Sequence, residues 1–179
     1  MNKLYLVRHG KTDWNVLEKV QGLTDIELNE EGIREAYKLS EEIDFDKIDV
    51  CLCSPLKRAR KTAEIIVNDR LDIIDDELLV ERCYGDFEGN HIEWDIVKLQ
   101  WNYKLNYSED NIETIHECME RAKKFLDKIR NEYKDKSILI VSHGGFIKAL
   151  HFTILGYDDD TDFLTFFPKN TQVYEYDLK

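Results

Sequence analysis

The chain has 179 residues, of which 42% are hydrophobic and 35% charged, and its formal net charge is −12. So acidic a chain is not expected to bind nucleic acid, because contacts along a phosphate backbone require a basic patch. The apolar runs are too short to cross a membrane and Met1 leads directly into a predicted strand without a signal-peptide pattern, so we expect a cytoplasmic protein.

The predicted elements alternate between strand and helix from the start of the chain. An apolar run over Lys3–Val7 predicts a buried strand. Asn29 is expected to cap the helix that follows, because an Asn side chain accepts hydrogen bonds from the first helical amides. The side chains expected on one face of that helix are Ile33, Ala36, Tyr37, Ser40 and Ile43. A second strand is expected over Ile48–Cys53, and helical spacing of apolar residues resumes after Pro55, from Leu56 to Val67.

The second half of the chain repeats this alternation. A short strand is expected within Leu71–Leu79, and Thr114–Glu117 matches a capping box at the start of a long helix. Ser137–Ser142 predicts another strand with a helix after it, and Thr171–Tyr176 predicts a final edge strand. This order predicts an α/β fold, a three-layer α/β/α sandwich with a mostly parallel central sheet, and we expect a single domain over residues 1–179.

Histidine, arginine and glycine follow the ends of two of these strands. Arg8, His9 and Gly10 come after the first strand, and His143 and Gly144 come after the strand that ends at residue 142. A single histidine at such a place is more often structural. Two His-Gly pairs favour a shared site, because ligands of open α/β sheets bind beyond the carboxyl ends of the strands.

Arg58 adds a second guanidinium at the same end of the sheet. It lies in the first turn of a predicted helix, where a cation opposes the helix dipole. Its basic neighbours Lys57, Arg60 and Lys61 also allow the simpler interpretation of a solvated turn. An anion between the helix start and Arg58 would explain the position, and two forked guanidinium groups suit a phosphoryl group.

Five ordered blocks resemble the motifs of the histidine phosphatase superfamily, which has the phosphoglycerate-mutase-like fold: RHGKTDWN, QGLTDIELNEEG, SPLKRARKTAE, ERCYGDFEG and VSHGG. The resemblance covers nearly the whole chain and implies a phosphoric monoester hydrolase of the histidine acid phosphatase type. It implies that His9 attacks phosphorus and forms a phosphohistidine, while Arg8, Arg58 and a protonated His143 hold the phosphate oxygens. Glu81 corresponds to the general acid, which protonates the leaving group and then activates water. Asn15 and Gly144 are further candidates for phosphate binding, with Gln21, Gly22, Thr12 and Tyr84 as secondary candidates.

The implied partner is a small phosphomonoester, and we expect a monomer or homodimer that binds neither nucleic acid nor membrane. We predict no metal and no other cofactor, because arginines supply the positive charge that metal phosphatases take from ions. Glu88 is a weaker candidate for the acid, and a structural role is favoured for it. The cysteines are predicted to be reduced structural residues, namely Cys51, Cys53, Cys83 and Cys118.

Three other functions remain open at this stage. ERCYG is similar to the acid block of cofactor-dependent phosphoglycerate mutases, but the short interval from Glu81 to His143 lacks their insertion and residues 91–111 contain no arginine. An α-ribazole phosphatase of cobalamin synthesis is a possible assignment. A non-catalytic binder of phosphorylated partners is disfavoured, because such a protein would typically have lost His9 or the acid.

The substrate wall beyond the phosphate is expected to come from Tyr84 and from His91–Tyr107, a segment rich in aromatic and amide side chains. These side chains suit an uncharged or partly apolar leaving group. Only Lys98 and Lys104 bring positive charge to this wall, so bisphosphorylated acids are expected to be poor substrates. A general small-molecule phosphatase is the first choice.

Overall fold

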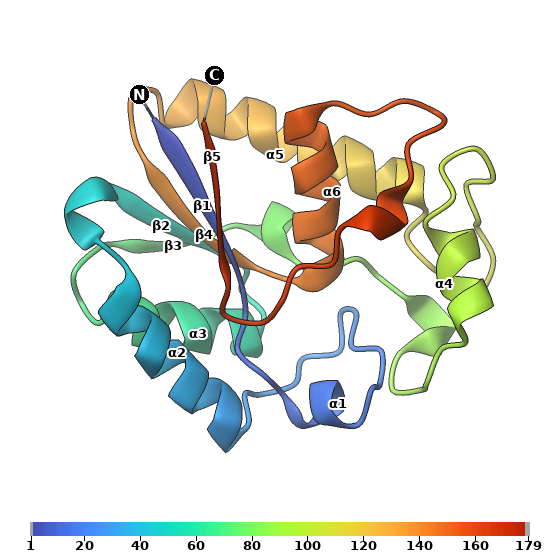
Figure 1. Ribbon diagram of the computed structural model, residues 1–179, viewed down its shortest axis with the longest axis horizontal. Coiled ribbons are helices and arrows are strands. Elements are labelled where there is room, and N and C mark those ends of the chain that lie inside the picture. The colour runs from blue at the N-terminus through green and yellow to red at the C-terminus, as the bar shows by residue number, and fades with distance from the viewer. Residues whose placement is uncertain (1, 178–179) are drawn as a thin grey trace.

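The structure, a computed structural model, describes residues 2–177, and its centre is a five-stranded sheet in the order β3-β2-β4-β1-β5 (Figure 1). The strands are β1 (Lys3–Arg8), β2 (Val50–Cys53), β3 (Ile73–Asp75), β4 (Ile138–Ser142) and β5 (Val173–Asp177). Strands β1 to β4 pair in parallel, and β5 pairs antiparallel with β1 at the edge. Lys3 lies opposite Asp177, so the described chain begins and ends at the same end of the sheet. The predicted mostly parallel sheet and the edge strand are confirmed.

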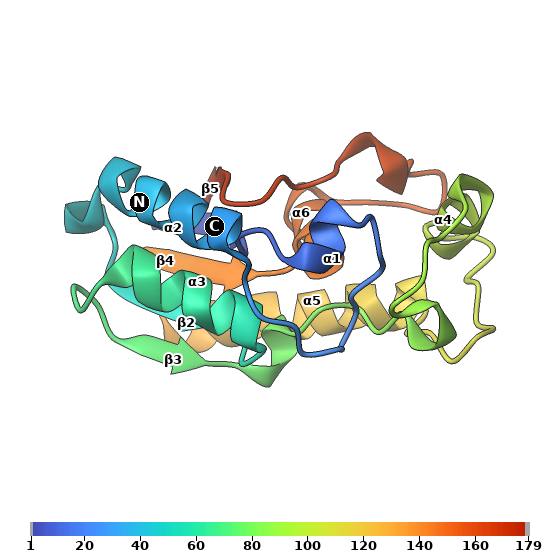
Figure 2. The same ribbon diagram turned by 90° about the horizontal axis from the view of Figure 1, so that it is seen from below.

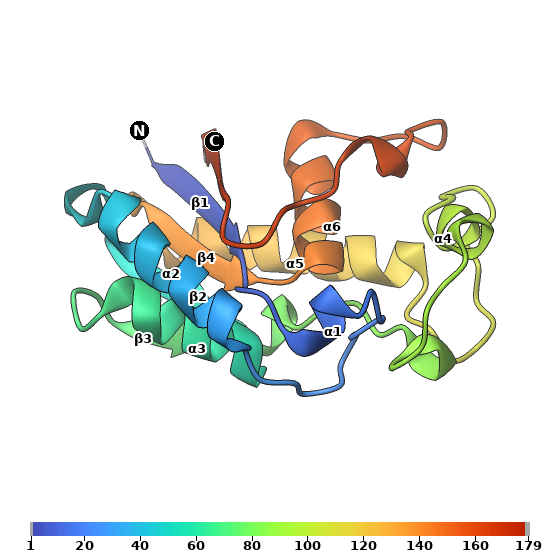
Figure 3. The same cartoon turned by 60° about the horizontal axis from the view of Figure 1, so that its bottom comes forward.

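Helices cover both faces of this sheet. The helices are α1 (Asp13–Val16), α2 (Glu30–Glu42), α3 (Lys57–Val67), α4 (Trp94–Gln100), α5 (Ile115–Glu132) and α6 (Gly144–Leu155). Successive side chains of a strand point to opposite faces. In β4, Ile138 and Ile140 therefore pack in the cluster formed with α5 and α6, while Leu139 and Val141 pack in the cluster formed with α2 and α3. Figure 3 shows α2 and α3 in front of the sheet and α5 behind it, and the predicted three-layer sandwich is confirmed.

Side chains cap several of the helices. Asn29 caps α2 and the Thr114–Glu117 capping box begins α5, as the sequence predicts. At the start of α3 the sequence predicts no cap, but the Asp25 carboxylate accepts a 2.7 Å hydrogen bond from the Lys57 amide. This carboxylate supplies the negative charge that a helix N-terminus favours, so no bound anion is needed to explain the start of α3.

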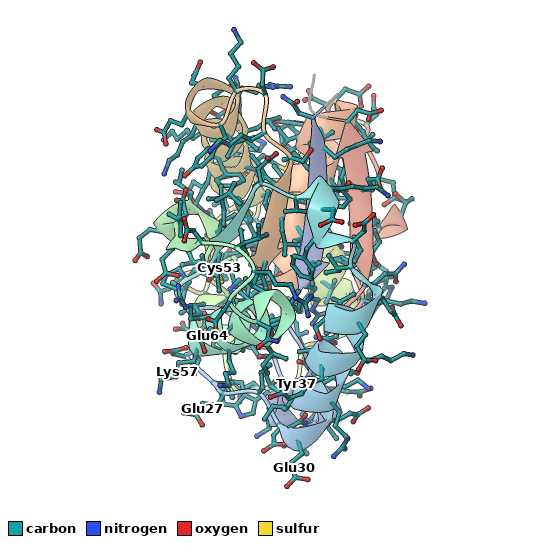
Figure 4. All side chains as sticks on the ribbon, turned by 90° about the vertical axis from the view of Figure 1, so that its left-hand side faces the viewer. Glu27, Glu30, Tyr37, Cys53, Lys57 and Glu64 are labelled. Carbon is teal, nitrogen blue, oxygen red and sulfur yellow. The ribbon has the colours of Figure 1, made fainter. Side chains whose placement is uncertain are left out.

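One local prediction is wrong. Tyr37, labelled in Figure 4 and expected on the buried face of α2, is 59% exposed, because the buried stripe of that helix runs through Ala36 and Leu39. The short strand expected within Leu71–Leu79 is β3, and Glu77–Leu79 after it forms a 3₁₀ helix.

The cysteines are all free, and Cys51 and Cys53 lie in the cluster under α2 and α3. Figure 4 labels Cys53. Burial raises the pKa of the Cys51 thiol to about 12, so it stays a protonated, unreactive core group. No helix within residues 2–177 is long and apolar enough to span a membrane. Helix α4 lies apart from the sheet, beyond α6 (Figures 1 and 2), and forms the far wall of the site described next.

Candidate active site

The carboxyl ends of β1 and β4 bring the two predicted histidines together. Parallel pairing places Arg8 opposite Ser142, and the ring centroids of His9 and His143 lie 5.2 Å apart. Both rings are buried, and a cavity of about 230 Å³ opens beside His9, at the end of the sheet that Figure 3 turns toward the viewer. The predicted site residues that line it are Arg8, His9, Asn15, Gln21, Gly22, Glu81, Tyr84 and Gly144.

His9 has one free ring nitrogen. Its Nδ1 lies 2.7 Å from the carbonyl oxygen of Gly10, which can only accept, so Nδ1 carries the hydrogen and Nε2 the lone pair. Burial and the guanidinium groups of Arg58 and Arg8 hold the pKa of His9 well below its ordinary value of 6.5. The ring is therefore neutral, and a neutral imidazole with an unprotonated Nε2 can act as a nucleophile.

His143 is held through the opposite nitrogen. Its Nε2 lies 2.7 Å from Ser54 Oγ, which also accepts a hydrogen bond from the amide of Leu56 at 3.3 Å. We assign the hydroxyl hydrogen to the bond with Nε2, because this gives the Ser54 hydroxyl an acceptor. Nδ1 then carries the hydrogen of His143, and it is buried without a partner.

A protonated His143 is expected from the sequence when phosphate oxygens are bound, and for that complex it stays a prediction. Burial and the guanidinium charges of Arg58 and Arg8 hold the pKa of His143 well below 6.5, so the ring is neutral. A neutral ring can still donate one hydrogen bond through Nδ1–H.

The two arginines are anchored to backbone carbonyls, and each keeps a buried, unpaired Nε. Arg8 Nη1 donates to Pro168 O at 2.9 Å. Arg58 donates from Nη1 to Thr24 O at 2.8 Å and from Nη2 to Gly22 O at 2.7 Å. Arg58 is fully buried, which excludes the solvated interpretation, but it supports the cavity wall from behind and does not line it.

Glu81 lies in the loop after the 3₁₀ helix Glu77–Leu79, and its carboxylate is hydrogen bonded to the first turn of α6 and lines the cavity. Its Oε1 accepts from the amides of Arg82 and Phe146, at 2.7 and 3.0 Å, and its Oε2 accepts from the Gly145 amide at 3.0 Å. A Cβ at position 145 would lie 2.7 Å from Glu81 Oε1 and 2.9 Å from the Tyr84 hydroxyl. Glycine there leaves room for a carboxylate held in a fixed place beside the cavity, where it can exchange a proton with a bound group.

Glu88, the weaker candidate for the acid, has the predicted structural role. Its carboxylate accepts hydrogen bonds from the amides of Leu23, Thr24 and Tyr84. These bonds tie the loop before Asp25 to the block that carries Glu81. Gly22 has a φ of +53°, and a Cβ there would lie 1.9 Å from Glu88 Oε1, so this glycine is required by the loop itself.

The remaining candidates differ in their access to the cavity. Thr12 is fully buried and forms a capping box with Asn15 at the start of α1, so it positions Asn15 and does not line the cavity. Asn15 Oδ1 accepts a hydrogen bond from the Thr12 amide at 3.1 Å, which leaves Nδ2 as the group that can donate to a phosphate.

Gln21 and Gly144 both line the cavity. Gln21 has a buried, unpaired Oε1. A Cβ at Gly144 would lie 3.3 Å from Arg8 Cζ, so this glycine makes room for the guanidinium.

The far wall confirms one prediction and adds residues that the sequence analysis missed. From the predicted His91–Tyr107 segment, Ile92, Val97, Gln100 and Trp101 line the cavity. The missed lining residues are Lys19, Val20, Gly145, Lys148, Phe167 and Pro168. Lys148 could have been found, since positions four apart share a helix face and it lies four residues after Gly144. No local pattern points to Phe167, which reaches the wall by tertiary packing.

The charge expected on this wall is also corrected. Lys98 and Lys104 are half exposed, pair with Asp95 and Asp160 and do not line the cavity. The lysines that line it are Lys19 and Lys148.

Several buried donors lack a hydrogen-bond partner, and those of Arg8, Gln100 and Lys148 belong to residues that line the cavity. Within residues 2–177, eight buried side-chain nitrogen or oxygen atoms have no hydrogen-bond partner, and all but Gln21 Oε1 are nitrogens. They belong to Arg8, Gln21, Arg58, Arg82, Gln100, His143 and Lys148. A buried unpaired donor costs about 1–3 kcal/mol, so this arrangement fits an anionic ligand. Residues 2–177 contain no group of three or more His, Cys, Asp or Glu side chains placed to hold a metal ion.

Known proteins show the same combination of motifs and fold. The model of the histidine phosphatase superfamily (branch 1) matches residues 4–179. The uncharacterized phosphatase PhoE of Bacillus subtilis (strain 168) is 41% identical over 162 residues, which cover 89% of this chain and 81% of that protein. The crystal structure of a phosphoserine phosphatase mutant from Entamoeba histolytica, in complex with phosphoserine, has 31% identity and a TM-score of 0.82 over 98% of this chain and 90% of the other. The alpha-ribazole phosphatase from Shigella flexneri has 27% identity and a TM-score of 0.82, with coverage of 98% and 90%.

Proposed function

The chain belongs to the histidine phosphatase superfamily (branch 1), and we propose that it is a phosphatase that hydrolyses small phosphomonoesters through a phosphohistidine intermediate on His9. The observation that carries this proposal is the neutral His9 with its free Nε2, in a cavity surrounded by unpaired donors. We also propose that residues 1–179 act as one domain.

In the first step Nε2 of His9 attacks phosphorus, and the bond from phosphorus to the ester oxygen breaks. The leaving oxygen takes a proton from Glu81, which lines the same cavity. Phosphoryl transfer depends mainly on positioning and on charge stabilisation at the equatorial oxygens. The donors assigned to those oxygens are Arg8 Nε, His143 Nδ1 and Asn15 Nδ2, and the Arg58 guanidinium adds positive charge from behind the wall.

In the second step Glu81, now ionised, takes a proton from water. The oxygen of that water attacks phosphorus, the bond from phosphorus to His9 breaks, and inorganic phosphate leaves. His9 returns to its neutral form because burial and the two arginines disfavour the charged ring. One residue therefore serves both proton transfers without moving far from the first turn of α6.

The assignment is tested by comparing leaving groups. Glu81→Gln is expected to lower kcat/KM for alkyl phosphates by on the order of 10²- to 10⁴-fold, and far less for p-nitrophenyl phosphate, whose leaving group needs little protonation. Glu77→Gln, at an exposed position of the same segment, is the matched control and should leave both rates unchanged.

Three results would contradict the proposal. Equal losses on both classes of leaving group would move the acid role away from Glu81. Activity that is abolished by a chelator and restored by a divalent ion would contradict the metal-independent mechanism. Isomerisation of 3-phosphoglycerate without release of phosphate would favour the phosphoglycerate mutase alternative.

A further inference from the structure

Lys148 is a buried cation beside the phosphate site, and no part of the mechanism above uses it. It lies on α6, four residues after Gly144, so it shares the cavity-facing side of that helix. Its side chain is only 2% exposed, and its Nζ has no hydrogen-bond partner. A buried, unpaired ammonium group is costly, which makes it a strong indication of a missing ligand.

Two aromatic rings hold this ammonium group at the cavity wall. Its Nζ lies 4.5 Å from the ring centroid of Trp101 and 3.4 Å from that of Phe167. Cation–π contacts of a desolvated cation contribute about 2 kcal/mol, but the rings provide no hydrogen-bond acceptor for the three ammonium hydrogens. Both rings also line the cavity, so they direct the cation toward the ligand space.

Two further unpaired donors belong to the same region. Gln100, 1% exposed, lines the cavity and has an unpaired Nε2. Arg82 is fully buried, its Nε donates to Glu113 O, and both of its Nη atoms lack a partner. The Arg82 guanidinium lies 4.7 Å from the same Trp101 ring that Lys148 contacts. The Lys148 ammonium group and the Arg82 guanidinium therefore contact one indole, and the Gln100 amide lines the same cavity as that ring.

We propose that Lys148, Gln100 and Arg82 form an anion subsite that binds a carboxylate of the substrate, next to the phosphate held at His9. The substrates are then short phosphorylated acids, rather than the esters of uncharged alcohols that the sequence analysis favoured. This inference rests on the proposed phosphatase function and names the substrate class for the same cavity.

The electrostatics around Lys148 support an anionic ligand. The charged groups that face it are Arg82, Glu81 and Asp162, and burial together with Arg82 lowers the pKa of Lys148 to about 7. Glu81 and Asp162 act in the opposite direction but do not compensate. A carboxylate bound at the ammonium group would restore the charged form and satisfy its hydrogens.

The experiment compares substrates that differ only in the carboxylate. Phosphoserine is paired with phosphoethanolamine, and 3-phosphoglycerate with glycerol 3-phosphate. The wild-type protein is expected to have a higher kcat/KM for the acid of each pair. Lys148→Met is expected to lower the acid-to-partner ratio by about 10- to 100-fold, mainly through KM, because a hydrogen bond to a charged group contributes about 1.5–3 kcal/mol.

Two variants control this experiment. Lys148→Arg keeps a cation at the site and should recover part of the ratio. Lys98→Met removes a half-exposed lysine of the neighbouring helix α4, which pairs with Asp95, and should leave the ratio at the wild-type value. Lys148→Gln replaces Lys148→Met if thermal unfolding shows that the methionine variant does not fold.

The outcomes separate the subsite from the proposed function. If the folded variant without the lysine, Lys148→Met or its replacement Lys148→Gln, retains the wild-type ratio while phosphomonoesters are hydrolysed, Lys148 is a packing residue and the subsite is wrong. If no phosphomonoester is hydrolysed, the proposed function is wrong, and the subsite is tested by calorimetric binding in His9→Ala. There, phosphoserine should bind about 10- to 100-fold more weakly when Lys148→Met is added, and an unchanged affinity would overturn the inference.

Discussion

The ends of β1 and β4 carry the same residue pair, His-Gly, and hold their imidazoles in the same tautomer, yet they present opposite groups to the site. At β1, the Nδ1–H of His9 is used by the Gly10 carbonyl, and the lone pair of Nε2 is free. At β4, the Nε2 lone pair of His143 is used by Ser54, and Nδ1–H is free. In the proposed mechanism, the first ring is therefore the nucleophile and the second a hydrogen-bond donor. The difference comes from a single neighbour of each ring.

The two glycines differ as well. A Cβ at Gly10 would lie 2.5 Å from the carbonyl oxygen of Gly32, so this glycine allows the end of β1 to pack against α2. A Cβ at Gly144 would instead meet the flexible end of the Arg8 side chain, at 3.3 Å. The first glycine serves the fold, and the second serves the site.

The largest expected effect is that of removing the nucleophile. His9→Ala should lower kcat by on the order of 10⁴-fold or more, and it should abolish the acid-labile phosphoenzyme, because no other neutral Nε2 faces the cavity. Rapid acid quenching with a labelled phosphomonoester measures the phosphoenzyme. Persistent labelling in this variant would show that the covalent bond forms on another residue. It would contradict the different roles proposed for His9 and His143.

A smaller loss is expected at the β4 end. His143→Ala should lower kcat by on the order of 10²- to 10³-fold, the usual effect of removing one donor to a developing charge. The phosphoenzyme should still form, but more slowly, when single-turnover reactions are followed by the same acid quench. A variant that lost labelling completely would give His143 the role assigned to His9.

The smallest effect concerns the two glycines and is measured by denaturant unfolding. Gly10→Ala should lower the free energy of unfolding by about 1–3 kcal/mol, because its Cβ would collide with backbone that cannot move aside. Gly144→Ala is the matched comparison and should cost less stability, since the long Arg8 side chain can shift. Equal destabilisation by the two substitutions would show that both strand ends serve the fold alone.

The sequence by itself determined the elements and most of the site, for reasons that are local. Alternating and helical spacing of apolar residues, together with the caps at Asn29 and Thr114, predict the order of strands and helices. Parallel strands end at one edge of a sheet, so the residues after β1 and β4 had to meet. Glu81 was predicted as the general acid only through the ERCYGDFEG motif. No local pattern distinguishes it from the other acidic residues of its segment, which are expected to be solvated.

The tertiary structure alone decided what each of these groups does. Arg8 is anchored by Pro168, 160 positions away, and Ser54 sets the free nitrogen of His143 from 89 positions away. No local pattern encodes such contacts, because they arise only when separate segments pack. The positive charge of the cavity also depends on tertiary structure. Lys98 and Lys104, the lysines of the segment 91–107, form ion pairs at the surface. Lys148 instead has a buried ammonium group without a hydrogen-bond partner. Burial and long-range pairing, which no short stretch of sequence contains, therefore decide which nitrogen atoms of these residues are left without a hydrogen-bond partner.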